Sequence, residues 1–137
     1  ATAALVNLTQ TSDSIRADFG SQGGIDLLMT AIFNADQELE EYICKSLVNL
    51  SLNLNNEERM MCCLVPLLQR MQHPAIPRVR ELATMTLANL ALNENIRKAI
   101  RESNNNAGLQ LVLRAFLQPI SDEHSYQALK LLTNLSM

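Results

Sequence analysis

The sequence predicts an all-α fold built as a helical solenoid, and two observations lead to this prediction. A short apolar block with a central asparagine recurs four times, at intervals of 42, 40 and 45 residues, and such self-similarity is typical of stacked helical repeats. The composition agrees, because Leu, Ala, Met and Ile favour helices, and only four Gly and four Pro are present for the turns of a β fold. The blocks are ALVNLT (4–9), SLVNLS (46–51), TLANLA (86–91) and LLTNLS (131–136), centred on Asn7, Asn49, Asn89 and Asn134.

Each block is predicted to end a long amphipathic helix. Counted from the asparagine, small or apolar residues lie at positions −6, −2 and +1, which share one face of a helix. The start of this helix is marked by Asp, Ser or Pro, which are typical of helix caps and first turns. The start segments are 34–42, 73–81 and 119–126.

Two further helices are expected between successive blocks. The first is short and carries an Ile-Arg pair in two of its copies, while the middle copy is looser. The second is apolar and follows a bend that glycine permits in the outer copies, whereas the middle copy has Pro66 in its first turn. The short helices are expected at 12–19, 55–61 and 93–100, and the apolar helices from Gly24, Leu64 and Gly108, with Gly23–Gly24 and Ala107–Gly108 at the bends.

The combination of ALxNLS, NxxIR and GGIxxLL motifs resembles the armadillo repeat over essentially the whole chain. This resemblance implies a right-handed α-solenoid of three-helix repeats, in which the third helices line a concave groove. HEAT repeats, which lack the recurrent LxNL block, are the alternative within the same architecture. The expected organisation is a single armadillo segment, taken from a longer array, with the last helix of a preceding repeat at 1–9 and repeats at 10–51, 52–91 and 92–137.

The resemblance also implies a role for the asparagines. In importin-alpha and beta-catenin, the peptide-binding members of the family, the recurrent asparagine holds the backbone of an extended partner. An amide side chain offers one acceptor and two donors, so it can pair with a peptide bond whatever the partner's sequence. The residues alone leave a second interpretation open, because an asparagine near a helix end can also satisfy terminal carbonyl groups. The candidate partner-binding asparagines are Asn7, Asn49, Asn89 and Asn134.

Other groove positions follow from helical spacing at −4 and −8 from each asparagine. Importin-alpha has Trp at −4, but this chain contains no Trp, which disfavours a receptor for classical nuclear localisation signals. Lysines at −4 resemble the basic groove of beta-catenin, while glutamates at −8 make the surface mixed in charge, so a peptide with acidic and apolar residues is favoured. Tyr126 is either an exposed anchor or a core residue. The added candidates are Lys45, Met85 and Lys130 at −4 and Glu41, Glu81 and Tyr126 at −8.

The leading functional prediction is a non-enzymatic scaffold or adaptor that binds an extended or helical segment of a partner protein. Two alternatives stay open: a regulatory or architectural segment of a larger enzyme, and a nuclear transport adaptor, which the missing Trp disfavours. No nucleophile–base pair, phosphate loop or metal-ligand spacing is visible, so we expect no catalytic residues, cofactor or metal.

Composition narrows the partners and the compartment. The net charge of −3 argues against nucleic-acid binding, and no apolar run reaches the ~18 residues of a membrane span. Three cysteines, two of them adjacent, do not form a disulfide framework, which favours the cytoplasm or the nucleus. Apolar residues at both ends predict that the segment associates with itself end to end.

Overall fold

The structure, a computed structural model, describes residues 2–72 and 75–137. Within these ranges the chain is all-helical and contains no β-strand, as the sequence predicts. The helices are α1 (Thr2–Thr11), α2 (Asp13–Ser21), α3 (Gly24–Ile32), α4 (Gln37–Leu50), α5 (Leu64–Arg70), α6 (Pro77–Leu90), α7 (Glu94–Asn106), α8 (Gly108–Leu117) and α9 (Asp122–Leu135), with 3-10 segments η1 (Leu54–Asn56) and η2 (Arg59–Cys63).

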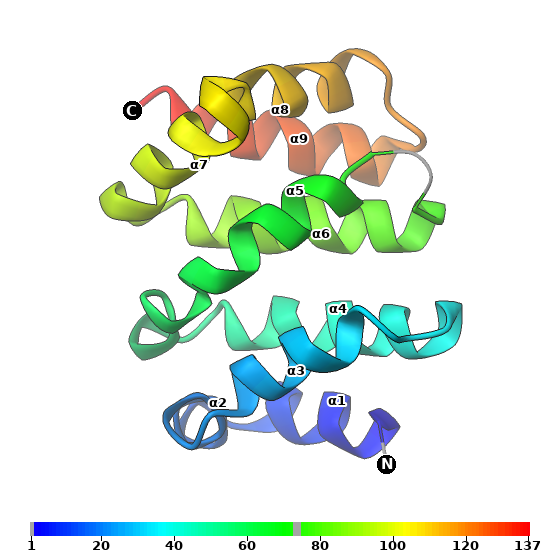
Figure 1. The fold of residues 1–137 in the computed structure, drawn as a ribbon, viewed down its shortest axis with the longest axis vertical. Coiled ribbons are helices and arrows are strands. Elements are labelled where there is room, and N and C mark those ends of the chain that lie inside the picture. The colour runs from blue at the N-terminus through cyan, green and yellow to red at the C-terminus, as the bar shows by residue number, and fades with distance from the viewer. Residues whose placement is uncertain (1, 73–74) are drawn as a thin grey trace.

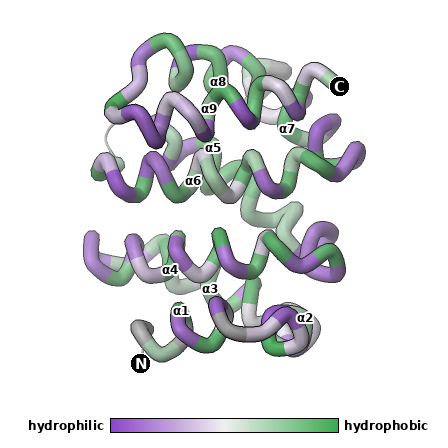
Figure 2. The backbone as a smooth tube through the Cα atoms, turned by 180° about the vertical axis from the view of Figure 1, so that it is seen from behind, coloured by the Kyte–Doolittle hydropathy of each residue, from purple (hydrophilic) through white to green (hydrophobic). Residues whose placement is uncertain are grey.

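The helices that carry the asparagine blocks stack in chain order. Helix α4 packs on α1, α6 packs on α4, and α9 packs on α6, so these four form one layer along the long axis of the molecule (Figure 1). Helices α3, α5 and α8 lie on the front of this layer in Figure 1, whereas α2 is seen end-on at its left edge, and the view from behind in Figure 2 shows the stacked helices nearest the reader. We call the side of α1, α4, α6 and α9 that faces away from α3, α5 and α8 the stacked face.

The long helices begin where local signals in the sequence place them. Asp36 precedes α4 and accepts a hydrogen bond from the Leu39 N–H at 2.8 Å, and Ser121 does the same for the His124 N–H at 3.0 Å. Pro77 is the first residue of α6, where its missing N–H leaves no bond unmade. Residues 73–74 of the expected start segment lie outside the described residues. The helices end at Leu50, Leu90 and Leu135, one residue after each asparagine.

Two boundaries differ from the expectation. Helix α1 continues to Thr11, so it extends two residues into the unit expected to begin at residue 10. In the middle unit, the expected helix at 55–61 is replaced by η1 and η2. At the start of this segment Asn53 acts as the N-cap, since its Oδ1 accepts a hydrogen bond from the Asn55 N–H at 2.9 Å.

The predicted apolar stripe forms the core between layers. In α4 and α6, the residues at −2 and +1 are completely buried, and a fully buried Leu side chain stabilises the fold by about 1.5–3 kcal/mol. The first block differs, because Leu8 at +1 is 54% exposed, and the side chains of Ala1 and Leu5 lie outside the described part. The buried stripe residues are Ile43, Leu47, Leu50, Ala83, Leu87, Leu90, Ala128 and Leu135.

The two glycine bends have different physical reasons. Gly23 has φ of 83°, a left-handed conformation that other residues adopt at a cost. Gly108 is needed for space, since a Cβ there would lie 1.8 Å from the carbonyl oxygen of Ile100. The second glycine therefore lets α7 and α8 approach closely.

Candidate partner-binding surface

A hollow of about 210 Å³ opens on the stacked face between α1, α4 and α6. Three of the predicted groove residues line it together: Lys45 and Asn49 from α4 and Met85 from α6. The rest of its wall comes from Val6, Gln10, Val48, Arg78 and Leu82. Half of its lining residues are apolar and half are polar, so the hollow offers both apolar contact and hydrogen-bonding groups to a ligand.

The charges around this hollow are partly neutralised within the chain. Lys45 Nζ lies 3.8 Å from Glu41 Oε2 and 5.3 Å from the centre of the Tyr42 ring. Arg78 donates to Glu81 Oε2 at 3.0 Å. Because such partly exposed pairs contribute little to stability, a partner can compete for either cation at small cost.

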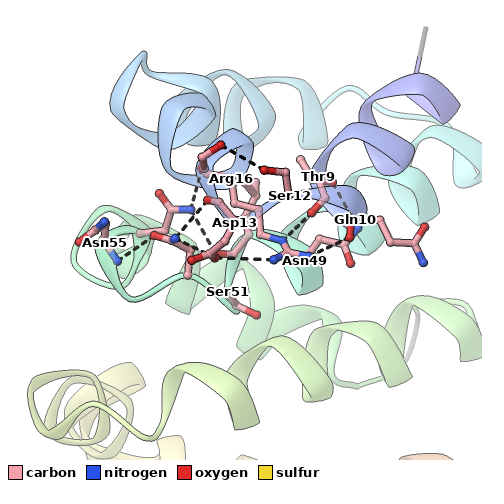
Figure 3. A network of polar contacts seen from close by, with 12 residues as sticks. Thr9, Gln10, Ser12, Asp13, Arg16, Asn49, Ser51 and Asn55 are labelled. Atoms are coloured by element: carbon pink, nitrogen blue, oxygen red, sulfur yellow. Dashed lines mark hydrogen bonds and ion pairs between the residues drawn. The ribbon is translucent and has the colours of Figure 1, made fainter.

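Asn49 points from α4 back toward α1 (Figure 3). Its Nδ2 donates to the carbonyl oxygen of Val6 at 3.3 Å and to Thr9 Oγ1 at 3.2 Å, which uses both amide hydrogens. Its Oδ1 accepts no hydrogen bond from the described residues, so this side chain can still accept one bond from a partner.

Asn89 on α6 and Asn134 on α9 likewise contact the preceding helix of the stack. Asn89 Nδ2 donates to Ser51 Oγ at 3.0 Å, and Asn134 Nδ2 donates to the carbonyl oxygen of Ala88 at 3.0 Å. Asn89 is half-buried and, within the described residues, keeps one N–H and its Oδ1 unpaired. Asn134 is buried. The structural interpretation of the asparagines is therefore supported, since three of them connect neighbouring helices of the stack.

The other predicted residues are distributed along the stacked helices rather than gathered in the hollow. Asn7 on α1 and Lys130 on α9 are exposed. Tyr126 on α9 is 61% exposed, which decides the open question of whether it belongs to the core. Glu81 has a structural contact in addition to Arg78, because its Oε1 accepts a hydrogen bond from Ser121 Oγ at 2.8 Å and so connects α6 to the start of α9.

A recurring arginine secures the end of two stacked helices. Arg16 donates to the carbonyl oxygens of Thr9 and Gln10 at the end of α1 (Figure 3). Arg97 donates to those of Ala91 and Leu92, at 3.1 and 3.0 Å, just after α6. The arginines thus supply charged donors to carbonyl groups at or just after the ends of α1 and α6, where helical bonding runs out.

The looser middle copy differs. Arg59 donates to the carbonyl oxygen of Asn55, four residues earlier in its own segment, and is exposed. Arg59 therefore donates to no carbonyl group at the end of a stacked helix.

Five residues of the hollow were not among the predicted candidates: Val6, Gln10, Val48, Arg78 and Leu82. A signal for two of them was present, because Val6 and Val48 stand at −1, three residues after the −4 position and on the same helical face. Gln10 gave no such signal, since it lies beyond the asparagine and reaches the hollow only because α1 continues past residue 9.

Comparison with known proteins supports the architecture. No family model and no curated protein matches the sequence. Two crystal structures of engineered proteins, both Northeast Structural Genomics Consortium targets, resemble it with TM-scores of 0.87 and 0.80, each at 19% sequence identity. The likeness covers 98% and 99% of this chain but only 54% and 33% of the engineered chains. At this identity the comparison shows the helical fold alone. No helix in the described ranges is long and apolar enough to cross a membrane.

Proposed function

We propose that this chain is a segment of an armadillo-type α-solenoid that acts as a protein interaction scaffold or adaptor. An extended segment of a partner would lie along the stacked face, across α1, α4, α6 and α9. The observation that carries this proposal is the hollow between α1, α4 and α6, where Lys45, Asn49 and Met85 come together.

The dimensions of the stacked helices suit an extended ligand. Packed helices lie about 8–10 Å apart, and an extended chain advances about 3.3 Å per residue, so each helix would contact roughly three residues. Asn89 keeps one donor and one acceptor unpaired among the described residues, which is the pair that a peptide unit complements. Asn49 would accept one bond from a partner N–H.

The chemistry of the hollow favours a particular kind of peptide. Apolar side chains of the ligand would contact Val48, Leu82 and Met85, and a carboxylate would compete with Glu41 for Lys45 or with Glu81 for Arg78. A peptide with alternating apolar and acidic residues would contact both the apolar side chains and the two cations of the hollow. A polybasic peptide would meet two cations.

The experiment is a selection of extended peptides from a displayed library, followed by affinity measurement on two matched variants. The groove variant carries Lys45→Glu and Asn49→Ala. The control variant carries the same changes on α7, Lys98→Glu and Asn95→Ala, at exposed positions outside the stacked face. Circular dichroism and thermal melting verify that both are folded.

We expect the groove variant to bind selected peptides at least about tenfold more weakly, the effect of about 1.4 kcal/mol, and the control variant to bind them as the parent does. Loss of binding in the α7 variant alone would place the interaction on the other side of the molecule. Equal binding by the parent, the groove variant and the control variant would overturn the groove assignment. The asparagines would then only connect neighbouring helices of the stack.

A further inference from the structure

A second cavity, of about 200 Å³, lies where α6 and α9 begin, between these helices and α5 and α8. It is separate from the stacked face, because three of its eight lining residues lie on α8 and a fourth, Gln118, directly follows that helix. Its polar lining consists of Gln72, Arg80, Arg114, Gln118 and His124, and no carboxylate is among its lining residues.

Among the residues that the structure describes, two buried nitrogen atoms of this lining have no hydrogen-bond partner: Arg80 Nε and His124 Nε2. His124 is only 1% exposed. Its Nδ1 accepts a hydrogen bond from the Ile120 N–H at 3.3 Å, so in the neutral ring the hydrogen is on Nε2. Both orphan atoms are therefore donors. Because buried polar groups are nearly always paired in folded proteins, two orphan donors on one cavity indicate an absent acceptor.

The charges around the cavity are predominantly positive. Arg80 and Arg114 both line it. Burial lowers the pKa of His124, the charge of Arg80 lowers it further, and only Glu81 opposes this shift. The carboxylate of Glu81 is already bonded to Arg78 and Ser121, and Asp122 and Glu123 on α9 are exposed and outside the lining. Arg70 on α5, also outside the lining, is paired with Glu40 at 3.2 Å.

We propose that this cavity is a binding site for an oxyanion group, a phosphate or a carboxylate, held by Arg80, Arg114 and His124. Oxyanions accept several hydrogen bonds at once, and bonds from a guanidinium are roughly twice as strong as neutral ones. A water molecule would accept at most two of these donors and would leave the positive charge uncompensated. The volume is several times that of one water molecule, about 30 Å³.

The test is a titration followed by NMR, with inorganic phosphate in one arm and acetate in the other, at constant ionic strength set by chloride. The readouts are the backbone amides of α8 and the start of α9, together with the imidazole resonances of His124. Arg114→Gln removes a cation that is exposed, so this variant is expected to fold. Arg59→Gln is the matched control, because it makes the same change at another exposed arginine that lies outside this cavity.

We expect saturable shifts in the parent protein and a rise in the pKa of His124 when the anion binds. Arg114→Gln and Arg80→Gln should each weaken binding by about tenfold, and Arg59→Gln should change it by less than about twofold. Tighter binding of phosphate assigns the site to phosphate groups, and tighter binding of acetate assigns it to carboxylates. Shifts that do not saturate, or that are the same in Arg114→Gln as in the parent, would overturn the proposal and leave a water-filled cavity.

Discussion

The amide of Asn89 donates to the hydroxyl of Ser51 at 3.0 Å, and that hydroxyl donates in turn to the carbonyl oxygen of Val48 at 2.6 Å. Between the preceding pair of stacked helices, Asn49 donates to the hydroxyl of Thr9, and that hydroxyl donates to the carbonyl oxygen of Val6 at 3.1 Å. The hydroxyl residue stands two positions after the preceding asparagine in both cases. Each asparagine block is thus hydrogen-bonded to the previous one.

This relationship predicts energetic coupling between Asn89 and Ser51. We expect Ser51→Ala and Asn89→Ala each to lower the free energy of unfolding by about 1–2 kcal/mol, because each removes the bond between Asn89 Nδ2 and the buried Ser51 hydroxyl, and Ser51→Ala also removes the bond to Val48. The double variant should lose about 1 kcal/mol less than the two single losses combined, since the shared bond can be lost only once. Urea unfolding measures all four proteins. Ser51→Thr is the control, because Thr9 fills the equivalent place, and additive losses would contradict the coupling.

The recurring arginines predict a contrast between two sites. We expect Arg97→Met to lower the free energy of unfolding by about 1.5–3 kcal/mol, because two helix-end carbonyl oxygens lose a charged donor. Arg59→Met should change it by less, about 1 kcal/mol or below, since Arg59 is exposed and its contacts are the carbonyl oxygen of Asn55 and a long bond of 3.4 Å to Asn56 Oδ1. Denaturant midpoints of the two variants check this. Equal effects would show that the contacts at the end of α6 do not contribute.

The cysteines predict selective labelling. Cys62 is exposed, whereas Cys44 and Cys63 are buried. Burial raises the pKa of Cys44 to about 12 and raises that of Cys63 as well, so both remain protonated thiols at pH 8. We expect a maleimide to add once to the native protein and three times after denaturation, as counted by mass spectrometry. In Cys62→Ser the native adduct should disappear, and a persistent fast adduct would mean that a buried thiol becomes accessible.

The burial of His124 predicts a dependence of stability on pH. The pKa of His124 in the folded protein is lowered from 6.5, first by burial and then by the charge of Arg80, so the folded state favours the neutral imidazole. Its contribution is fully present above pH 6.5 and is lost as the pH falls below that value, where the unfolded chain takes up a proton first. We expect the stability of the parent to fall more steeply between pH 7 and pH 5 than that of His124→Gln. Parallel curves from chemical denaturation would contradict this.

Much of the helical framework could be predicted because its signals are local. The residues Asp36, Pro77 and Ser121 begin helices through bonds or dihedral angles within one turn, and the apolar stripe before each asparagine specifies which side is buried. The replacement of the helix at 55–61 by two 3-10 segments was not predicted. Two local bonds accompany it, from the Asn55 N–H to Asn53 Oδ1 and from Asn56 Nδ2 to the carbonyl oxygen of Leu50.

Only those residues of the candidate surface could be predicted that share one face of a single helix. Lys45, Asn49 and Met85 follow from counting along α4 and α6, and they do line one hollow. Counting along a helix cannot show that Asn49 bonds to α1, or that Glu81 bonds to Ser121 at the start of α9. These contacts depend on the offset between helices that are separated by about forty residues in sequence.

The sequence by itself thus determined an all-helical chain, the starts of its long helices and the face that each one buries, because periodicity and capping act within a few residues. Only the tertiary structure decided where the asparagine amides donate, that Tyr126 is exposed, and that Arg80 and His124 line one cavity from different helices. The physical reason is that hydrogen bonds and burial between layers depend on how helices pack. Side-chain volumes along the whole interface determine that packing, and no single motif specifies it.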